Sequence, residues 1–294
     1  MTNSKKAKRF QFWINVVLIL ITLSIVLPFV LVFISSLTDE NTLIRNGYSF
    51  FPEKFSFYAY SYIIRQGEKI LRAYGITVFV TIVGTAANIA MSALLAYPLS
   101  VKKLPYRRAI TFFVFFTMLF NGGLVPTYIL MNQTLHLKNT YLALIIPLLV
   151  NVWYLIMLRT FMSDIPNEII ESARIDGAGN WMIYSRFVLP LSKPALATVG
   201  LLTLLDYWNS WQPAMLYIDK KEMYPLQYML QVMLRNIIEI LKEMQNNVSL
   251  GSANIPTEST RMAMCLLAVG PMLFVFPFFQ KYFTQGLTVG AVKG

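Results

Sequence analysis

The residues from Phe10 to Leu37 form a long apolar run that contains no charged side chain. A helix needs about 20 such residues to cross the hydrocarbon core of a bilayer. A secretory signal peptide has a shorter apolar region, of about 7–15 residues, and ends in a small-residue cleavage site. This run is longer and lacks such a site, so it predicts a retained membrane-spanning helix.

The composition of the whole chain agrees with a membrane protein. Hydrophobic residues make up 56% of the 294 positions and charged residues only 13%, about half of the roughly 25% found in soluble domains. The net charge of +11 does not indicate a nucleic-acid partner, because the basic residues cluster beside apolar runs, where they orient membrane helices. The single cysteine, Cys265, and the single histidine, His136, indicate no disulfide, metal site or catalytic triad.

Further apolar segments predict an all-α integral membrane protein with six transmembrane helices in one domain, residues 1–294. The expected spans lie at about 12–37, 73–100, 109–131, 139–162, 192–217 and 260–283. More polar segments lie at 38–71 and 218–259, and an amphipathic loop lies at 163–191. Within the second polar segment, an apolar stripe over 226–244 predicts a helix that packs on the membrane surface or on a partner.

The basic residues give the orientation of these helices, because lysine and arginine are enriched in cytoplasmic loops. They precede the first span and occupy the turn after the second: Lys5, Lys6, Lys8, Arg9, Lys102, Lys103, Arg107 and Arg108. Both sets fall on one side of a six-span chain. We therefore expect both termini and the loop at 163–191 in the cytoplasm, and 38–71 and 218–259 outside.

The loop contains ESARIDGAG at residues 171–179. Pro166 fits a first helical turn, and Glu171 follows at a place that favours carboxylates. Ala173 and Gly177 are four residues apart on one helix face, so small side chains there would let a partner approach closely. The pattern predicts two short cytoplasmic helices, the first with a small, charged tip. The alternative is an interfacial helix that merely lies on the membrane.

This stretch resembles the EAA loop of ABC importer permeases. That loop has E-A-A, three residues, a glycine and then about nine residues to an I-x-L-P-like end. Here it reads Glu171, Ser172, Ala173, Gly177 and FVLP at 187–190, with Ser172 replacing the commonest alanine. The tail GLTVGAVKG at 286–294 is similar to that of the smaller six-helix permease subunit of maltose-type oligosaccharide importers. The resemblance implies the type I ABC importer permease (MetI-like) fold with a cytoplasmic coupling helix.

The resemblance also implies partners in a bacterial cytoplasmic membrane: a homologous second permease, two ATP-binding subunits and an extracytoplasmic sugar-binding protein. The coupling helix would dock onto the ATPases through Glu171, Ser172, Ala173, Arg174, Asp176 and Gly177. The tail would reach the ATPase interface through Gly286, Leu287, Thr288, Gly290 and Lys293. The sequence has no G-x-x-x-x-G-K-[ST] motif. ATP and Mg²⁺ are therefore expected on the partner ATPases, with no cofactor bound by this non-enzymatic chain.

Two stretches are candidates for the substrate path. FNGGLVPTYILM at 120–131 breaks the third span, and such breaks mark transport sites or packing kinks. DYWNSWQP at 206–213 combines the acid, amide and aromatic groups that bind sugars, although Trp211 suits an interfacial aromatic belt equally. The path candidates are Asn121, Gly122, Gly123, Asn151, Tyr154, Asp206, Trp208 and Asn209.

The sequence thus predicts a permease subunit of an ATP-driven importer for a carbohydrate, in particular an oligosaccharide. The alternatives are half of an ion-coupled carrier, an ABC permease for another substrate, and a membrane enzyme. Asp206 is the one plausible carboxylate inside a span, whereas an ion-coupled carrier normally has several ionisable groups in its core. Paired carboxylates or a nucleophile with a base would be needed for an enzyme, and neither is evident.

Overall fold

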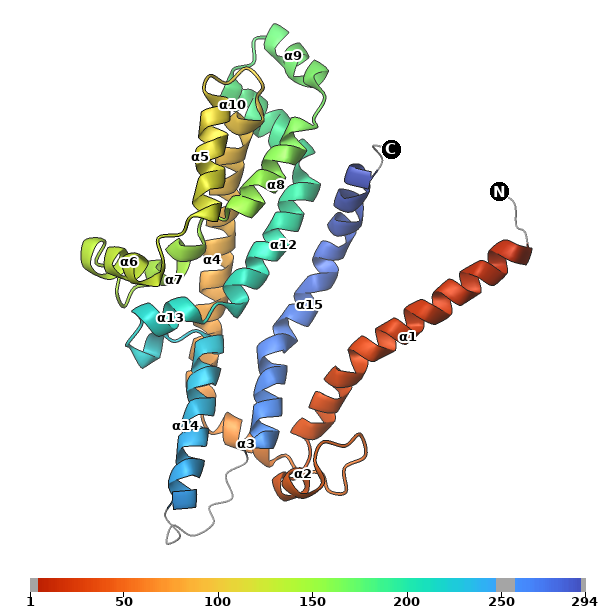
Figure 1. Cartoon of the computed structure of the whole chain (residues 1–294), viewed down its shortest axis with the longest axis vertical. Coiled ribbons are helices and arrows are strands. Elements are labelled where there is room, and N and C mark those ends of the chain that lie inside the picture. The colour runs from red at the N-terminus through yellow and green to blue at the C-terminus, as the bar shows by residue number, and fades with distance from the viewer. Residues whose placement is uncertain (1–4, 247–256, 292–294) are drawn as a thin grey trace. The chain divides into compact units, whose positions relative to one another are not determined.

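The computed structural model describes residues 5–246 and 257–291, and the side chains of 8–239 and 257–279 within them. The described elements are almost entirely helical, which confirms the predicted all-α class. The chain forms two compact units, one from 1–67 with 230–270 and one from 68–229 with 271–294. Figure 1 labels the helices, and by sequence α14 and α15 each contribute residues to both units.

The first unit contains the long apolar run as one helix, followed by two short helices in the more polar segment at 38–71. Its elements are α1 (Lys5–Ser36), α2 (Glu40–Asn46), α3 (Tyr58–Ile64) and parts of α14 (Leu226–Asn246) and α15 (Glu258–Ala291). None of the most apolar stretch of α1 is buried within the chain. An exposed apolar surface of this length needs lipid or another protein around it, which agrees with a membrane-spanning helix.

The second unit contains α4 (Gly67–Ser100) and a series of shorter, interrupted helices. They are α5 (Arg107–Leu119), α6 (Leu124–Ile129), η1 (Leu130–Thr134), α7 (Leu142–Ile145), η2 (Ile146–Leu148), α8 (Val152–Ser163), α9 (Asn167–Ile175), α10 (Asn180–Ile183), η3 (Tyr184–Val188), α11 (Leu189–Leu191), α12 (Lys193–Asn209), α13 (Gln212–Tyr217) and η4 (Lys221–Met223). Short interruptions separate these helices, so the chain changes direction inside its apolar segments.

Three described helices are long and apolar enough to cross a membrane: Lys8–Ser36, Gly67–Ser100 and Glu258–Phe279. Three helix pairs pass the same test together but are bent at a short break. The bends are 104° for Arg107–Leu119 with Leu124–Thr134, 53° for Leu142–Leu148 with Val152–Ser163, and 75° for Asn180–Leu191 with Lys193–Asn209. If each bent pair is one crossing, the described residues hold six, and the six-span topology stays a prediction.

The apolar stripe of α14 differs from the expectation that it covers the membrane surface or a partner. Its described members Leu226, Met229, Leu230, Met233 and Ile237 are all buried within the chain itself. At its first turn, the Leu226 N–H donates to the hydroxyl of Thr77 on α4, with an N–O distance of 2.8 Å. A stripe that is buried inside the chain cannot provide an outer contact surface. The two last members, Ile240 and Leu241, lie beyond the described side chains.

Candidate functional site

The cytoplasmic-loop candidate is centred on α9, which is anchored to the rest of the second unit by its apolar face. Ala173 is buried and belongs to a core cluster with residues of α8, α10 and η3, against which Ile170 also packs. Other members of the same cluster include Leu158, Met162, Ile165, Ile183, Tyr184 and Val188. Ala173 and Ile170 therefore connect α9 to the core of the second unit.

The end of α9 requires a glycine. Gly177 has a φ of +82°, which side-chain-bearing residues rarely adopt. The Ala178 N–H donates to the Ala173 carbonyl at 2.9 Å, and the Gly177 N–H donates to the Arg174 carbonyl at 3.0 Å. The 6→1 bond and the positive φ are those of a Schellman cap. A Cβ atom added at Gly177 would meet nothing within 4 Å, so backbone conformation, and not space within this chain, selects glycine here.

The face of α9 that points away from the core is polar and charged. Glu171, Ser172, Arg174, Asp176 and Gly177 are exposed. Large apolar side chains accompany them, with Ile175 86% exposed and Trp181 69% exposed. Exposed apolar groups among charged ones are typical of a surface that another protein covers.

Ala173 corrects one sequence-based expectation. It was expected to give a partner close access, but its side chain is buried against the chain's own core. Helical spacing places Ala173 on a face with Ile170, and the fold turns that face inward. Of the predicted tail residues, Gly286, Leu287, Thr288 and Gly290 lie in the last turns of α15, and Lys293 lies outside the described residues.

The substrate-path candidate begins where the third expected span breaks. The helix α5 ends at Leu119 and α6 starts at Leu124, as the asparagine and glycines at 121–123 predict. The Asn121 Oδ1 accepts the Gly123 N–H at 2.9 Å, and Gly123 has a φ of +89°. The Thr127 hydroxyl donates to the Gly123 carbonyl at 2.8 Å. Side-chain bonds of this kind replace the missing helical ladder at the break.

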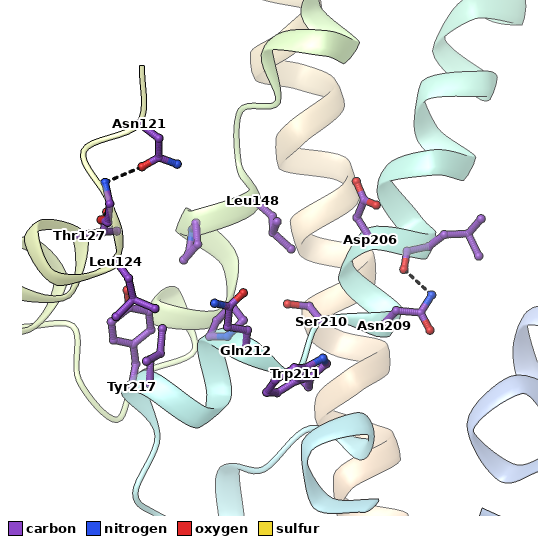
Figure 2. A pocket seen from close by; sticks show the side chains of 15 residues that line it. Asn121, Leu124, Thr127, Leu148, Asp206, Asn209, Ser210, Trp211, Gln212 and Tyr217 are labelled. Atoms are coloured by element: carbon purple, nitrogen blue, oxygen red, sulfur yellow. Dashed lines mark hydrogen bonds between the residues drawn. The ribbon is translucent and has the colours of Figure 1, made fainter. Parts of the chain in front are cut away.

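A pocket of about 730 Å³ lies beside this break. Figure 2 shows its wall, formed by the break with α6, by η2, by the end of α12 and by α13. The lining residues are Asn121, Gly123, Leu124, Thr127, Pro147, Leu148, Leu205, Asp206, Asn209, Ser210, Trp211, Gln212, Pro213, Leu216 and Tyr217. A cavity of this size, mostly apolar with a few polar groups, is typical of a small-molecule site.

The polar groups of the pocket can bind a ligand rich in hydroxyls. Asn121, Asn209 and Gln212 offer amides, Asp206 offers a carboxylate, and the Trp211 indole offers an aromatic face. The Tyr154 hydroxyl donates to one oxygen of Asp206 at 2.7 Å. This bond holds the carboxylate from α8, and the second carboxylate oxygen can still accept a hydrogen bond.

Four of the predicted path residues line this pocket: Asn121, Gly123, Asp206 and Asn209. The others do not. Trp208 is only 3% exposed, and its ring centroid lies 6.3 Å from that of Tyr74 on α4. Asn151 caps α8 by accepting the Trp153 N–H at 3.0 Å, and Tyr154 acts through Asp206. Gly122 lies in the break but outside the lining.

Sequence reasoning missed several lining residues and underestimated another. The sequence pattern does not single out Thr127, Ser210, Gln212 or Tyr217. It assigns Trp211 equally to a sugar contact and to an interfacial aromatic belt. The signal for Ser210 and Gln212 was present, since both lie in the aromatic and polar stretch at 206–213. Thr127 likewise lies in the stretch at 120–131 that breaks the third span, whereas Tyr217, at the end of α13, lies outside both stretches and carries no sequence signal.

Comparison with known proteins finds a family and relatives that are membrane components of transport systems. The family of binding-protein-dependent transport system inner membrane components matches residues 81–289. The polygalacturonan/rhamnogalacturonan transport system permease protein YtcP of Bacillus subtilis (strain 168) is 38% identical over 291 residues, 98% of this chain and 100% of that protein. The arabinooligosaccharides transport system permease protein AraQ of the same strain is 25% identical over 302 residues, with full coverage of both chains.

A solved structure extends the similarity to the fold. One chain in the crystal structure of a bacterial ABC transporter involved in the import of the acidic polysaccharide alginate superposes with a TM-score of 0.78. Its sequence is 27% identical, and the match covers 96% of this chain and 99% of that chain. The likeness therefore includes almost every element described above.

Proposed function

The chain belongs to the binding-protein-dependent transport system inner membrane components, and from this premise we propose that it is the permease subunit of an ATP-driven carbohydrate importer. Membership confirms the resemblance to ABC importer permeases. It also removes the ion-coupled carrier as an alternative. We propose an oligosaccharide as substrate, because the relatives named above carry polygalacturonan/rhamnogalacturonan and arabinooligosaccharides.

The observation that carries this proposal is the pocket at the break between α5 and α6. Its amides, carboxylate and indole are the groups that recognise sugar hydroxyls and sugar faces. Broken helices at membrane depth are tolerated where their backbone lines a cavity. Asn121, Asp206, Asn209 and Trp211 are therefore the proposed sugar contacts of this subunit, with Gly123 giving the backbone its close approach.

The exposed face of α9 is the proposed contact with the ATPases. Glu171, Ser172, Arg174 and Asp176 provide polar contacts, and Gly177 shapes the turn that presents them. Ala173 of α9 and three residues of α8 belong to one core cluster, and through it a displacement of α9 would be passed to α8. The residues Gly286, Leu287, Thr288, Gly290 and Lys293 of the tail are proposed to reach the same ATPases.

The proposed assembly has this chain beside a homologous permease, above two ATP-binding subunits and below an extracytoplasmic sugar-binding protein. ATP and Mg²⁺ bind to the ATPases, so this chain is a transport subunit and no catalyst. It lies in the cytoplasmic membrane of a bacterium with both termini in the cytoplasm. The basic residues beside the first two spans support this orientation.

The test is reconstitution of the whole complex in proteoliposomes. Purification through this chain should recover an ATPase, and its hydrolysis rate should rise when the binding protein and an oligosaccharide are added together. The oligosaccharide should accumulate inside the vesicles only with ATP. An ATPase whose rate ignores both additions, or the absence of any ATPase, would contradict the proposal.

A further inference from the structure

A fully buried amide connects three elements of the second unit. Asn88 on α4 has 0% of its surface exposed. Its Nδ2 donates to the Leu148 carbonyl at 2.9 Å, and its Oδ1 accepts the Thr203 hydroxyl of α12 at 3.2 Å. The Ser92 hydroxyl lies 3.5 Å from the same oxygen. Such an amide is costly to place inside a membrane protein unless its groups are paired, and polar residues there commonly serve a function.

A second buried side chain makes a parallel contact. The Tyr207 hydroxyl on α12 donates to the Ile145 carbonyl at 2.8 Å, and Tyr207 is buried. Its ring lies directly over Gly84 of α4, where an added Cβ atom would come within 2.5 Å of the ring. The absence of a side chain at Gly84 lets the ring sit there. The hydroxyl is thus directed at one backbone carbonyl by packing.

Both acceptors lie at the interruption between α7 and α8. The helical ladder stops here, because the chain passes from α7 into the 3₁₀ turn η2 and α8 begins only at Val152. The Leu149 N–H donates to the Ile146 carbonyl at 3.1 Å. In a continuous α-helix it would donate to the carbonyl of Ile145, four residues before it. A backbone carbonyl has two lone pairs, so where the α-helical ladder is interrupted inside a membrane it can accept a side-chain donor. Tyr207 supplies such a donor to Ile145, and Asn88 supplies one to Leu148.

The same interruption forms part of the pocket wall. Pro147 and Leu148 line the pocket, and Asp206, the neighbour of Tyr207, lines it from α12. On its other side, α8 runs from the interruption to the core cluster that anchors α9. The interruption therefore lies on the covalent path from the proposed ATPase contact to the proposed sugar pocket.

We propose that Asn88, Thr203 and Tyr207 form a polar clamp that makes this interruption rigid. The clamp rests on the proposed transport function and adds positioning residues to it. Because the carbonyls of Ile145 and Leu148 are held by these hydrogen bonds, α7, η2 and α8 move together. A displacement of α8 therefore moves the part of the pocket wall that η2 forms. Without the clamp, the interruption bends and absorbs the displacement, so ATP is hydrolysed with less sugar moved. All three residues act through the backbone of the wall, and none of them lines the pocket.

The chain offers a matched pair of substitutions for the test. Thr203→Val removes a hydroxyl of α12 that donates to Asn88 on another helix, α4. The control, Thr198→Val, removes a hydroxyl that donates at 3.0 Å to the Pro194 carbonyl within α12 itself. Tyr207→Phe removes the donor to Ile145 and leaves the ring over Gly84. Asn88→Leu removes its contacts with Leu148, Thr203 and Ser92 together. If this variant does not assemble, Thr203→Val and Tyr207→Phe still test the clamp.

The experiment uses the complete complex in proteoliposomes and measures sugar transported per ATP hydrolysed. We expect Thr203→Val and Tyr207→Phe each to lower this ratio roughly fivefold, the effect of one ordinary hydrogen bond, and Thr198→Val to keep the wild-type ratio. A ratio unchanged in both clamp variants overturns the clamp, even if less complex assembles. An equal fall in Thr198→Val also overturns it. A wild-type complex that moves no sugar would instead refute the proposed function.

Discussion

Glu40 and Ser259, far apart in the sequence, are joined by two hydrogen bonds to one carboxylate oxygen. The Ser259 N–H and hydroxyl donate to Glu40 Oε2 at 2.9 and 2.6 Å. The other oxygen, Oε1, accepts the Thr257 N–H and hydroxyl and the Glu258 N–H. Glu40 thus supplies the partners that the free N–H groups at the start of α15 require. A residue of the polar segment at 38–71 thus caps the beginning of the last long helix.

This cap predicts a pH-dependent stability. Burial disfavours the Glu40 carboxylate, but the hydrogen bonds from Ser259, Thr257 and the helix backbone outweigh it, so the pKa of Glu40 is lowered. Because the pKa is lower in the folded state, the stabilisation is complete above the ordinary glutamate value. It is lost as the pH falls through the folded-state value. At neutral pH, Glu40→Gln should lower the free energy of unfolding by about 1.5–3 kcal/mol, as for hydrogen bonds to a charged group.

Thermal unfolding of the detergent-solubilised protein between neutral and acidic pH measures this effect. The melting temperature of Glu40→Gln should lie below that of the wild type at neutral pH, and the two should converge in acid. Glu53→Gln is the control, because Glu53 is an exposed acid in the same segment, 38–71. A constant difference at all pH values would mean that the carboxylate charge does not contribute.

The cap at the end of α9 predicts that two nearby glycines respond differently to alanine. Gly177→Ala forces a side chain into φ +82°, at a cost of about 1–2 kcal/mol. Gly179 has a φ of −70° and open space around it, so Gly179→Ala should be tolerated. Gly177→Asn should fall between them, because asparagine visits this region more readily. Cellular sugar uptake, normalised to the amount of permease, should follow this order, and equal uptake in both alanine variants would contradict it.

The pocket predicts different consequences for two tryptophans. Trp211→Ala removes the aromatic face of the wall and should lower the maximal transport rate about five- to tenfold with saturating binding protein, since an aromatic contact contributes about 1–1.5 kcal/mol. Trp153→Ala is the control, because Trp153 is exposed on α8 and outside the pocket lining. The prediction fails if both variants transport at the same rate.

The local features of this chain could be predicted from its sequence, and the directions of its side chains could not. The break at Asn121 follows from residues that are poor helix formers, and α9 follows from its charge and glycine pattern. Whether Ala173 faces a partner or the core depends on α8 and α10, which no local pattern specifies. Similarly, α12 ends at Asn209, so Trp208 turns towards Tyr74 and Trp211 joins the pocket.

Long-range polar contacts lie beyond sequence reasoning for a different reason. Glu40 looks like a surface acid, and Asn88 looks like one polar residue in an apolar helix. Each gains its role from backbone groups that a distant helix end or interruption leaves without partners. A single sequence shows which residues can donate or accept, but not which carbonyl or N–H will need them.

The turn at Asn139 provides the last prediction, which distinguishes the contribution of a backbone contact to stability from that of an ion pair. The Asn139 side-chain oxygen accepts the Asp219 N–H at 2.7 Å, and Asn139 has a φ of +59°. The Lys138 ammonium pairs with the Asp219 carboxylate at 2.9 Å and lowers the pKa of Asp219, but both groups are exposed.

Solvent and salt screen an exposed pair, so Asp219→Asn should leave the melting temperature almost unchanged. Asn139→Ala loses both the acceptor and the tolerance for positive φ, and should lower the stability by about 1–2 kcal/mol. Asn139→Gly keeps the backbone conformation and should recover part of this loss. If Asp219→Asn proves the more destabilising substitution, the ion pair and not the backbone contact holds this turn.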